Sequence, residues 1–250
     1  MKTAFVTGAS AGFGKAICRA LIADNYRVIG GARRADKLAE LKRELGEHFI
    51  ALPLDVTDAA SLDAACESIR DSSLHIDLLV NNAGLELGID RAQSADAKNW
   101  ERMIATNVTG LAMVTHKLLP AMVEANNGLI INIGSIAGTY PYPGGNVYGA
   151  SKAFVKQFSL NLRADLAGTR VRVSNIEPGL CSGTEFSLVR LAGDQDAVNA
   201  LYRDVEAIRP EDLANTVVWI AGQPPHVNIN SVEIMPVAQS YAALNIARNL

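Results

Sequence analysis

The sequence predicts an α/β fold in which a doubly wound, seven-stranded parallel sheet is covered by helices on both faces. Short apolar runs alternate along the chain with longer segments whose apolar residues recur with helical periodicity, as is typical of parallel sheets. The 250 residues, 49% of them hydrophobic, are enough to bury a large core, so we expect residues 1–250 to form one domain. Polar residues also follow the ends of several expected strands, which is where ligands bind in such sheets.

The expected strands and helices alternate without a linker or an internal repeat. The strands cover residues 4–7, 27–31, 49–54, 78–81, 129–133, 170–176 and 232–235. Helices with apolar residues at a period of about 3.6 fall between them, notably over 16–22, 37–45, 61–69, 100–124 and 148–166.

A glycine-rich turn joins the first expected strand to the first helix. The spacing is Gly-x-x-x-Gly-x-Gly, formed by Gly8, Gly12 and Gly14, and the turn also holds Ser10 and Phe13. Such a turn lets backbone N–H groups and the start of a helix approach a pyrophosphate, because no Cβ blocks the ligand. Turns of this kind also occur for packing alone, so the motif by itself leaves both interpretations open.

The end of the second expected strand bears on the choice of dinucleotide. A site specific for NAD usually carries an acidic residue there, which binds the ribose 2′-hydroxyl. Arg33 and Arg34 occupy this place, with no carboxylate before Asp36. A guanidinium suits a 2′-phosphate, and Ser10 adds a hydroxyl donor. The alternative is that both arginines are solvated residues at the start of a helix. We predict that the cofactor is NADP(H).

Tyr148 and Lys152 form the most informative pair in the chain, with Ser135 thirteen residues before the tyrosine. In a helix, residues four apart share one face, with about 5–6 Å between Cβ atoms. A nearby positive charge favours the phenolate, so we expect Lys152 to lower the pKa of Tyr148 from about 10. Ser135 would hold the substrate oxygen on which charge develops. This set suits proton exchange with an alcohol or carbonyl group.

Taken together, these motifs resemble those of the single-domain short-chain dehydrogenases/reductases, which have a Rossmann fold. The resemblance spans the whole chain in the family's order, and the matching residues are Thr7, Gly8, Gly12, Gly14, Asp55, Asn81, Asn82, Ala83, Gly84, Asn107, Ser135, Tyr148, Lys152, Pro178 and Gly179. It implies an enzyme that acts on CH–OH groups. Asn107, Ser135, Tyr148 and Lys152 would then be its catalytic residues.

The resemblance also implies further contacts to the cofactor. Asp55, with Val56 beside it, would lie near the adenine, and the Asn81, Ala83 and Gly84 turn would pass close to the ribose. Lys152 would bind the nicotinamide ribose. The remaining expected cofactor contacts are Tyr148, Pro178, Gly179 and Thr184, although Thr184 stands one residue further from Gly179 than is usual in the family.

Asn107 is a polar residue in an otherwise apolar helical stretch. Its amide either satisfies a kink in the helix or holds a water that relays protons to Lys152. The resemblance favours the relay.

A segment of about residues 181–208 follows the sixth expected strand, where the family places its variable substrate lid. Three stretches, 176–180, 183–186 and 226–230, resemble those of bacterial NADP-dependent 3-hydroxy acid dehydrogenases, which also act on serine, allo-threonine and malonic semialdehyde. Close relatives of that group reduce sulfoacetaldehyde to isethionate. We expect Ser135, Tyr148 and Arg190 to bind the substrate, with the Arg190 guanidinium on a carboxylate or sulfonate; an exposed lid arginine is the alternative. Tyr140 and Tyr142 would shape a small pocket or simply pack in the core.

Composition excludes several classes of function. The formal charge of −3 gives no electrostatic reason to expect nucleic acid as a partner. No apolar run approaches the roughly 20 residues that cross a bilayer, and the start of the chain leaves no room for a signal peptide. The three cysteines and four histidines are scattered, so we expect neither a disulfide framework nor a metal site. Cysteines that stay reduced are typical of a cytoplasmic protein, and we expect that location.

Two other classes of protein share parts of this pattern. A non-catalytic dinucleotide-sensing protein should lack the tyrosine or the lysine, and a nucleotide-sugar epimerase usually has a longer carboxyl-terminal substrate domain.

Residues 100–124 and 148–166 are apolar on more than one face, so each needs a second burial surface. By resemblance to the family we expect a homotetramer, in which residues 231–250, including Tyr241, could reach a neighbouring subunit.

Overall fold

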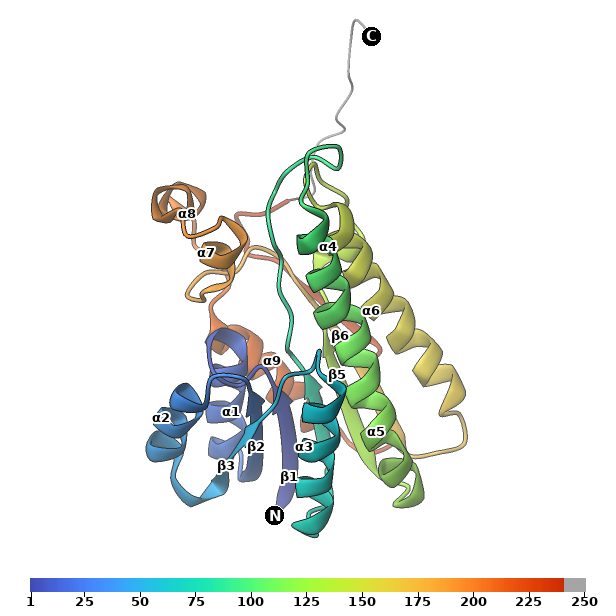
Figure 1. Ribbon diagram of the computed structural model, residues 1–250. Helices are drawn as coiled ribbons and strands as arrows, with labels where there is room; N and C mark the ends of the chain where they lie inside the picture. Colours follow the sequence, from blue (N-terminus) through green and yellow to red (C-terminus); the bar gives the residue numbers. More distant parts are fainter. Residues whose placement is uncertain (241–250) are drawn as a thin grey trace, which may run out of the picture.

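The computed structural model describes residues 1–240 and has the predicted architecture (Figure 1). Its sheet has seven strands in the order β3-β2-β1-β4-β5-β6-β7, and each neighbouring pair is parallel. The strands are β1 (Lys2–Thr7), β2 (Tyr26–Ala32), β3 (Phe49–Pro53), β4 (Leu78–Asn81), β5 (Gly128–Ile133), β6 (Val171–Pro178) and β7 (Ser231–Ile234). The strand order reverses between β1 and β4. That switch point is where open α/β sheets bind ligands, at the carboxyl ends of the strands.

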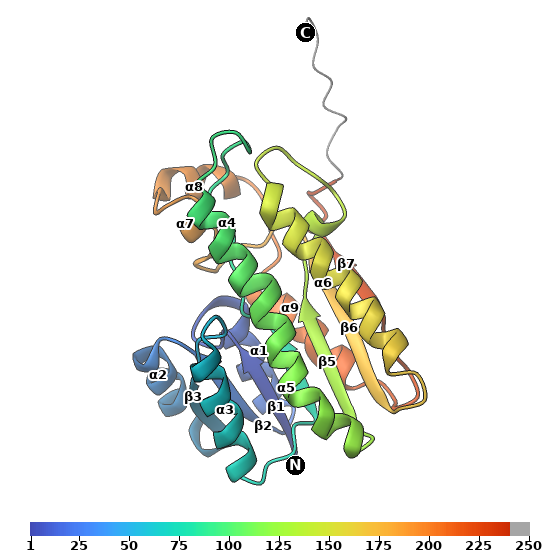
Figure 2. The ribbon, with the colours of Figure 1, turned by 45° about the vertical axis from the view of Figure 1, so that its right-hand side comes forward.

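Helices cover both faces of the sheet (Figures 1 and 2). One apolar cluster joins the sheet to α1 (Gly12–Ala23), α2 (Ala35–Leu45) and α9 (Pro210–Ala221). A second cluster joins the other face to α3 (Ala59–Asp71), α5 (Leu111–Glu124) and α6 (Asn146–Asp165). Two 3-10 turns, Gly46–His48 and Ile136–Gly138, lie at strand ends.

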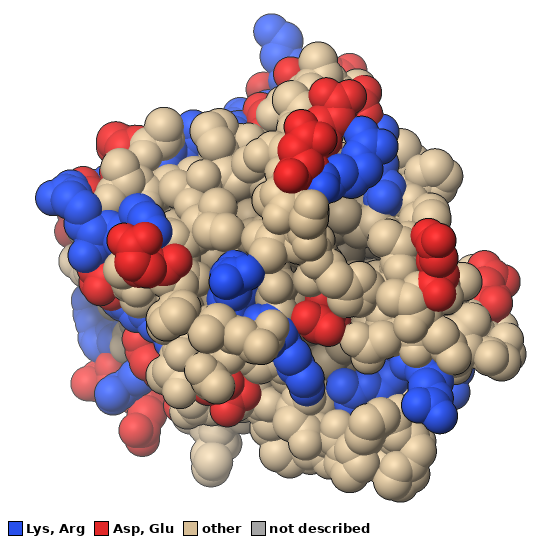
Figure 3. All heavy atoms as spheres, turned by 90° about the horizontal axis from the view of Figure 1, so that it is seen from below, with Lys and Arg blue, Asp and Glu red and all other residues tan. Residues whose placement is uncertain are grey.

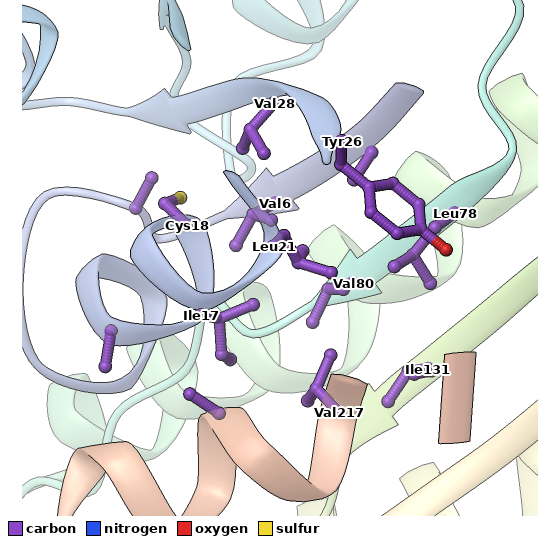
Figure 4. Packing of buried hydrophobic residues seen from close by; sticks show 14 of the residues in the cluster. Val6, Ile17, Cys18, Leu21, Tyr26, Val28, Leu78, Val80, Ile131 and Val217 are labelled. Atoms are coloured by element: carbon purple, nitrogen blue, oxygen red, sulfur yellow. The ribbon is translucent and has the colours of Figure 1, made fainter. Parts of the chain in front are cut away.

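Alternation of side chains along β1 explains how one strand serves both layers. Val6 packs toward α1 and α9, whereas Phe5 packs into the opposite cluster, because successive side chains of a strand point to opposite faces. Figure 4 shows Val6 beside Ile17 and Leu21 of α1, with Val217 of α9 completing this layer. The nearly continuous apolar runs of the strands follow from burial on both sides.

The helix expected over residues 100–124 begins earlier and is interrupted. It consists of α4 (Ala97–Ile104), a π-helical turn (Ala105–Gly110) and α5, which follow one another as one rod beside α6 (Figure 2). The turn lies against the loop after β3: a Cβ on Gly110 would come within 2.8 Å of the Val56 side chain. Asn107 therefore sits in a local change of helical pitch, a feature often found at functional sites.

The segment 181–208, called the lid segment below, lies beyond the carboxyl edge of the sheet and contains α7 (Phe186–Arg190) and α8 (Gln195–Tyr202) (Figure 1). Its two ends are joined by hydrogen bonds. Ser182 N donates to Ile208 O at 2.9 Å, and Ile208 N donates to Leu180 O at 3.1 Å. The segment is thus anchored at its base, while its helices lie over the ends of the strands.

The face seen from below in Figure 3 carries basic and acidic side chains interspersed with uncharged ones, not gathered by sign. Within residues 1–240, none of the helices has the length and apolar character needed to cross a bilayer. Residues 231–250 were expected to reach a neighbouring subunit. Of these, Tyr241 and the rest of 241–250 lie outside the described residues.

Candidate active site

A cavity of about 750 Å³ opens at the carboxyl ends of the strands, below the lid segment. It brings together residues that are far apart in the sequence but were predicted to share one site. Those that line it are Gly8, Ser10, Gly12, Phe13, Arg33, Arg34, Asp55, Val56, Ala83, Gly84, Ser135, Tyr148, Lys152, Pro178, Gly179, Thr184 and Arg190. Gly14, Asn81 and Asn107 do not line it.

Ser135, Tyr148 and Lys152 meet at the end of β5. Ser135 caps the 3-10 turn after this strand, and its Oγ accepts a hydrogen bond from Ala137 N at 3.1 Å. Tyr148 and Lys152 lie in the first turns of α6. This helix is held close to the serine loop, since a Cβ on Gly138 would come within 2.7 Å of the Lys152 carbonyl carbon.

Burial controls the ionisation of both groups on α6. It lowers the pKa of Lys152 to about 8, although the negative charge of Glu86 acts in the opposite direction. The ammonium donates to Ile133 O at 2.8 Å and lies 5.8 Å from the centre of the Tyr148 ring.

For Tyr148, burial raises the pKa well above its ordinary value, and the charge of Glu86 adds to this effect. A hydrogen bond with Ser135 acts in the lowering direction but does not outweigh them. The direction predicted from the sequence was therefore wrong for the ligand-free chain, because desolvation of the phenolate exceeds any stabilisation by the lysine.

Asn107 is fully engaged in holding the chain together. Its Oδ1 accepts from Leu85 N at 2.9 Å, and its Nδ2 donates to Leu85 O at 2.8 Å and to Ser151 Oγ at 3.1 Å. These contacts tie the π-helical turn to the loop after β4 and to α6. They agree with the alternative in which the amide satisfies a helix kink, while the proton relay stays a prediction.

The glycine-rich turn leaves the start of α1 open toward the cavity. Ala11 occupies the N-cap position, where none of the described side chains caps the helix, so N–H groups of the first turn stay accessible. Gly8 has φ +69° and Gly12 has φ +50°, values that L side chains rarely adopt. This geometry fits the pyrophosphate of a dinucleotide.

Gly14 has a packing role in this turn, while its contact with the cofactor stays a prediction. A Cβ there would come within 2.2 Å of Gly8 O, so only glycine lets α1 begin so close to the turn.

Arg33 and Arg34 line the cavity just beyond the end of β2. Arg34 Nε donates to Ser10 Oγ at 3.3 Å, and Arg34 Nη1 lies 2.9 Å from Glu185 in the lid segment. The three predicted donors for a 2′-phosphate therefore lie at one end of the cavity. The residues present fit NADP better than NAD, because an anion here would meet guanidinium and hydroxyl groups.

Asp55 and Val56 line the same end of the cavity. Thr57 donates to Asp55 Oδ1 from its backbone N at 2.9 Å and from its hydroxyl at 2.7 Å. Burial alone would raise the pKa of Asp55, but these hydrogen bonds and the charge of Arg33 lower it. The carboxylate is thus ionised and fixed as an acceptor.

Asn81 is buried and does not line the cavity, so its predicted contact with the ribose gains no support from the structure. Its Nδ2 donates to Thr115 Oγ1 and to Asn132 Oδ1, both at 2.9 Å, within the layer between sheet and helices. Its neighbour Asn82 faces the cavity instead, and its Nδ2 donates to Thr7 O at 2.9 Å. The motif indicated this residue, but it was not among the predicted contacts.

The loop after β6 is closed by the carboxyl-terminal segment. Gly179 N donates to Ile234 O at 2.8 Å, and Gln239 Oε1 accepts from Leu180 N at 2.7 Å. Gln239 lines the cavity and was missed, because a single glutamine near the end of a chain carries no sequence signal. Thr184 lies over the glycine-rich turn, where a Cβ on Gly12 would come within 3.1 Å of its side chain.

The inner end of the cavity contains a buried acid that sequence reasoning also missed. Glu86 is 2% exposed and accepts from Tyr142 Oη at 2.6 Å, and Arg190 Nη1 lies 3.4 Å from its other oxygen. Burial raises the pKa of Glu86, although Tyr142 and Arg190 act in the lowering direction. The sequence does contain a signal for this residue: it is an acidic residue between two leucines, Leu85 and Leu87, just past the Asn-Asn-Ala-Gly turn.

Comparison with known proteins finds relatives that match nearly the whole chain. The family model of short chain dehydrogenases matches residues 2–191. A probable NADP-dependent dehydrogenase of Haemophilus influenzae is 55% identical over 246 residues, which cover 98% of each chain. The NADP-dependent 3-hydroxy acid dehydrogenase of Escherichia coli K12 is 53% identical over 243 residues, or 97% of this chain and 98% of that protein. A solved closed form of serine dehydrogenase complexed with NADP+ matches with a TM-score of 0.97 and 52% identity, covering 99% of this chain and 100% of that one.

Proposed function

Because the chain belongs to the short-chain dehydrogenase family, we propose that it is an NADP(H)-dependent oxidoreductase for a short anionic hydroxy compound. The reaction interconverts this compound with its aldehyde or ketone, as for a 3-hydroxy acid such as 3-hydroxypropionate and malonic semialdehyde, or for serine and the aldehyde that keeps its amino group. One observation carries the proposal. A single cavity holds Ser135, Tyr148 and Lys152 at one end and the two arginines after β2 at the other.

The choice of NADP(H) rests on those arginines. Arg33 and Arg34 stand where an acidic residue would select NAD, and Ser10 adds a hydroxyl to the same end of the cavity. The relatives named above support this choice, since the Haemophilus influenzae and Escherichia coli proteins are both described as NADP-dependent and the serine dehydrogenase was solved with NADP+.

The glycine-rich turn and the two arginines after β2 would hold NADPH in this cavity, where the coenzyme would supply the hydride that reduces the carbonyl carbon. Ser135 Oγ accepts from Ala137 N, and its hydroxyl also forms the hydrogen bond with Tyr148; with substrate bound, this hydroxyl would donate to the substrate oxygen instead. A tyrosine is protonated at neutral pH at its ordinary pKa of about 10, and burial raises the pKa of Tyr148 further, so its phenol holds the proton that it donates to this oxygen. Lys152 holds a positive charge next to the phenol and binds the nicotinamide ribose. Alcohol oxidation uses the same residues in reverse.

Arg190 supports an anionic substrate. It lines the same cavity as Tyr148, its side chain is mostly buried, and its Nε has no hydrogen-bond partner among residues 1–240. A substrate carboxylate would satisfy this donor. The sulfoacetaldehyde alternative gains no support from the relatives, whose names refer to hydroxy acids and serine.

Coenzyme absorbance with the purified chain tests the proposal. Malonic semialdehyde, sulfoacetaldehyde and uncharged propanal are compared as substrates with NADPH and with NADH. We expect the highest kcat/KM for malonic semialdehyde with NADPH. Equal values for propanal would contradict an anionic substrate, and equal values with NADH would contradict the role of the two arginines.

A homotetramer and a cytoplasmic location belong to the same proposal. Met113 of α5 and Phe154 and Leu160 of α6 are 43%, 37% and 44% exposed, although they are large and apolar. Exposed apolar side chains on two neighbouring helices support burial against a second copy of the chain (Figure 2). Light scattering measures the assembly state; a monomeric mass would contradict this part of the proposal.

A further inference from the structure

Glu86 places a carboxylate inside the substrate end of the cavity. It lies in the loop after β4, lines the same cavity as Ser135 and Tyr148, and is almost completely buried. A buried carboxylate is costly unless it is paired and hydrogen-bonded. Tyr142 and Arg190 supply these partners. The charge of Glu86 also raises the pKa values of Tyr148 and Lys152, as expected of a carboxylate that lines the same cavity.

Neither member of the Glu86–Arg190 pair has its bonding capacity filled. A carboxylate can accept about four hydrogen bonds. Within the described part of the chain, Glu86 accepts from Tyr142 on one oxygen and from Arg190 on the other. Arg190 uses one Nη for Glu86, and its buried Nε has no partner among residues 1–240. The pair therefore offers a positive and a negative contact side by side.

The charges of this pair decide which substrates fit. The charges of Glu86 and Arg190 offset one another, so the carboxylate of a plain hydroxy acid can bind the free Nε of Arg190 but is repelled by the neighbouring carboxylate of Glu86. A 2-amino-3-hydroxy acid carries its ammonium on the carbon that bears its carboxylate. Its two charges can reach two side chains that are themselves in contact, the carboxylate on Arg190 and the ammonium on Glu86.

We propose that Glu86 is a specificity-determining residue that selects a zwitterionic 2-amino-3-hydroxy acid, of the serine type, over a 3-hydroxy acid without the amino group. This inference rests on the proposed function. It adds a role for a residue that neither the proton-transfer set nor the coenzyme contacts include.

The test compares Glu86→Gln with the wild type in NADP+-dependent oxidation of L-serine, D-serine and 3-hydroxypropionate. In the wild type, kcat/KM should be at least tenfold higher for one enantiomer of serine than for 3-hydroxypropionate. In Glu86→Gln this ratio should fall at least tenfold, mainly through a higher KM for serine. Glu86→Asp, which keeps the charge, should recover part of the ratio.

Two controls separate charge from structure. Tyr142→Phe removes a hydrogen bond to Glu86 but no charge, so the substrate ratio should change less than threefold. Glu47→Gln removes a negative charge from a side chain that is 98% exposed and should leave both activities unchanged. The melting temperature and the affinity for NADP+ of each variant show whether it is folded.

A measurement on the wild type does not depend on any variant. L- or D-alanine should inhibit serine oxidation with a Ki at least tenfold below that of propionate. Equal Ki values, a wild-type preference for 3-hydroxypropionate, or an equal loss of both activities in Glu86→Gln would overturn the inference. Failure of the proposed function would look different, since the wild type would then oxidise none of these compounds.

Discussion

Burial of the Lys152 amine should make the stability of the ligand-free chain depend on pH. Lys152 is 7% exposed, and burial lowers its pKa from 10.5 to about 8, with Glu86 acting in the opposite direction. This difference corresponds to about 3 kcal/mol, at about 1.4 kcal/mol for each pKa unit. The unfolded chain binds more protons than the folded chain between these values, so stability rises with pH in this range. Below the pKa of Lys152 in the folded chain, the full free-energy cost of burying the charged amine opposes folding.

Urea unfolding of the wild type and of Lys152→Met at pH values of about 7 and 9.5 measures this effect. The free energy of unfolding of the wild type, relative to Lys152→Met, should rise by about 2 kcal/mol between the two conditions. Exposed lysines, cysteines and tyrosines titrate in both proteins and cancel in this difference. Tyr148 is also present in both, and its raised pKa costs stability only above about pH 10. A relative change below about 0.5 kcal/mol would refute the reasoning, because the amine would then not be desolvated.

Three further results are expected. Tyr148→Phe should lower kcat for carbonyl reduction by about 100-fold or more with little change in NADPH affinity, and a loss below tenfold would exclude Tyr148 as the acid. Arg33→Asp should raise KM for NADPH at least tenfold relative to NADH, whereas Arg43→Ala, on the exposed side of α2, should leave the preference unchanged. Asn132→Ala should lower the free energy of unfolding by about 1–3 kcal/mol, because it leaves buried groups of Asn81 and Ser159 without their partner; an unchanged urea midpoint would contradict this.

The sheet and the proton-transfer set were predictable because their signals are local. Strands buried on both sides are short apolar runs, and the spacing of Tyr148 and Lys152 places both on one helix face whatever surrounds them. The glycine-rich turn and the arginines after β2 likewise depend on residues that are close in sequence. Parallel strands then bring these segments to one edge of the sheet.

What could not be predicted depends on contacts between distant segments. Asn81 and Asn82 are neighbours, and only the exact end of β4 decides which one faces the cavity. Glu86 and Arg190 are 104 residues apart, so their pairing has no local signal. The direction of the Tyr148 pKa depends on how completely the ring is buried. The π-helical turn at Asn107 follows from packing against the loops after β3 and β4, whereas the periodicity of its sequence indicates an ordinary helix.

Phe186, at the start of α7, lies against Tyr148 with 5.9 Å between ring centres. A side chain of the lid segment, which lies over the cavity, thus contributes to the burial of the phenol. A substitution that removes the Phe186 ring would expose the hydroxyl to water and bring the pKa of Tyr148 back toward its ordinary value. The position of Phe186 therefore bears both on access to the cavity and on the pKa of the phenol.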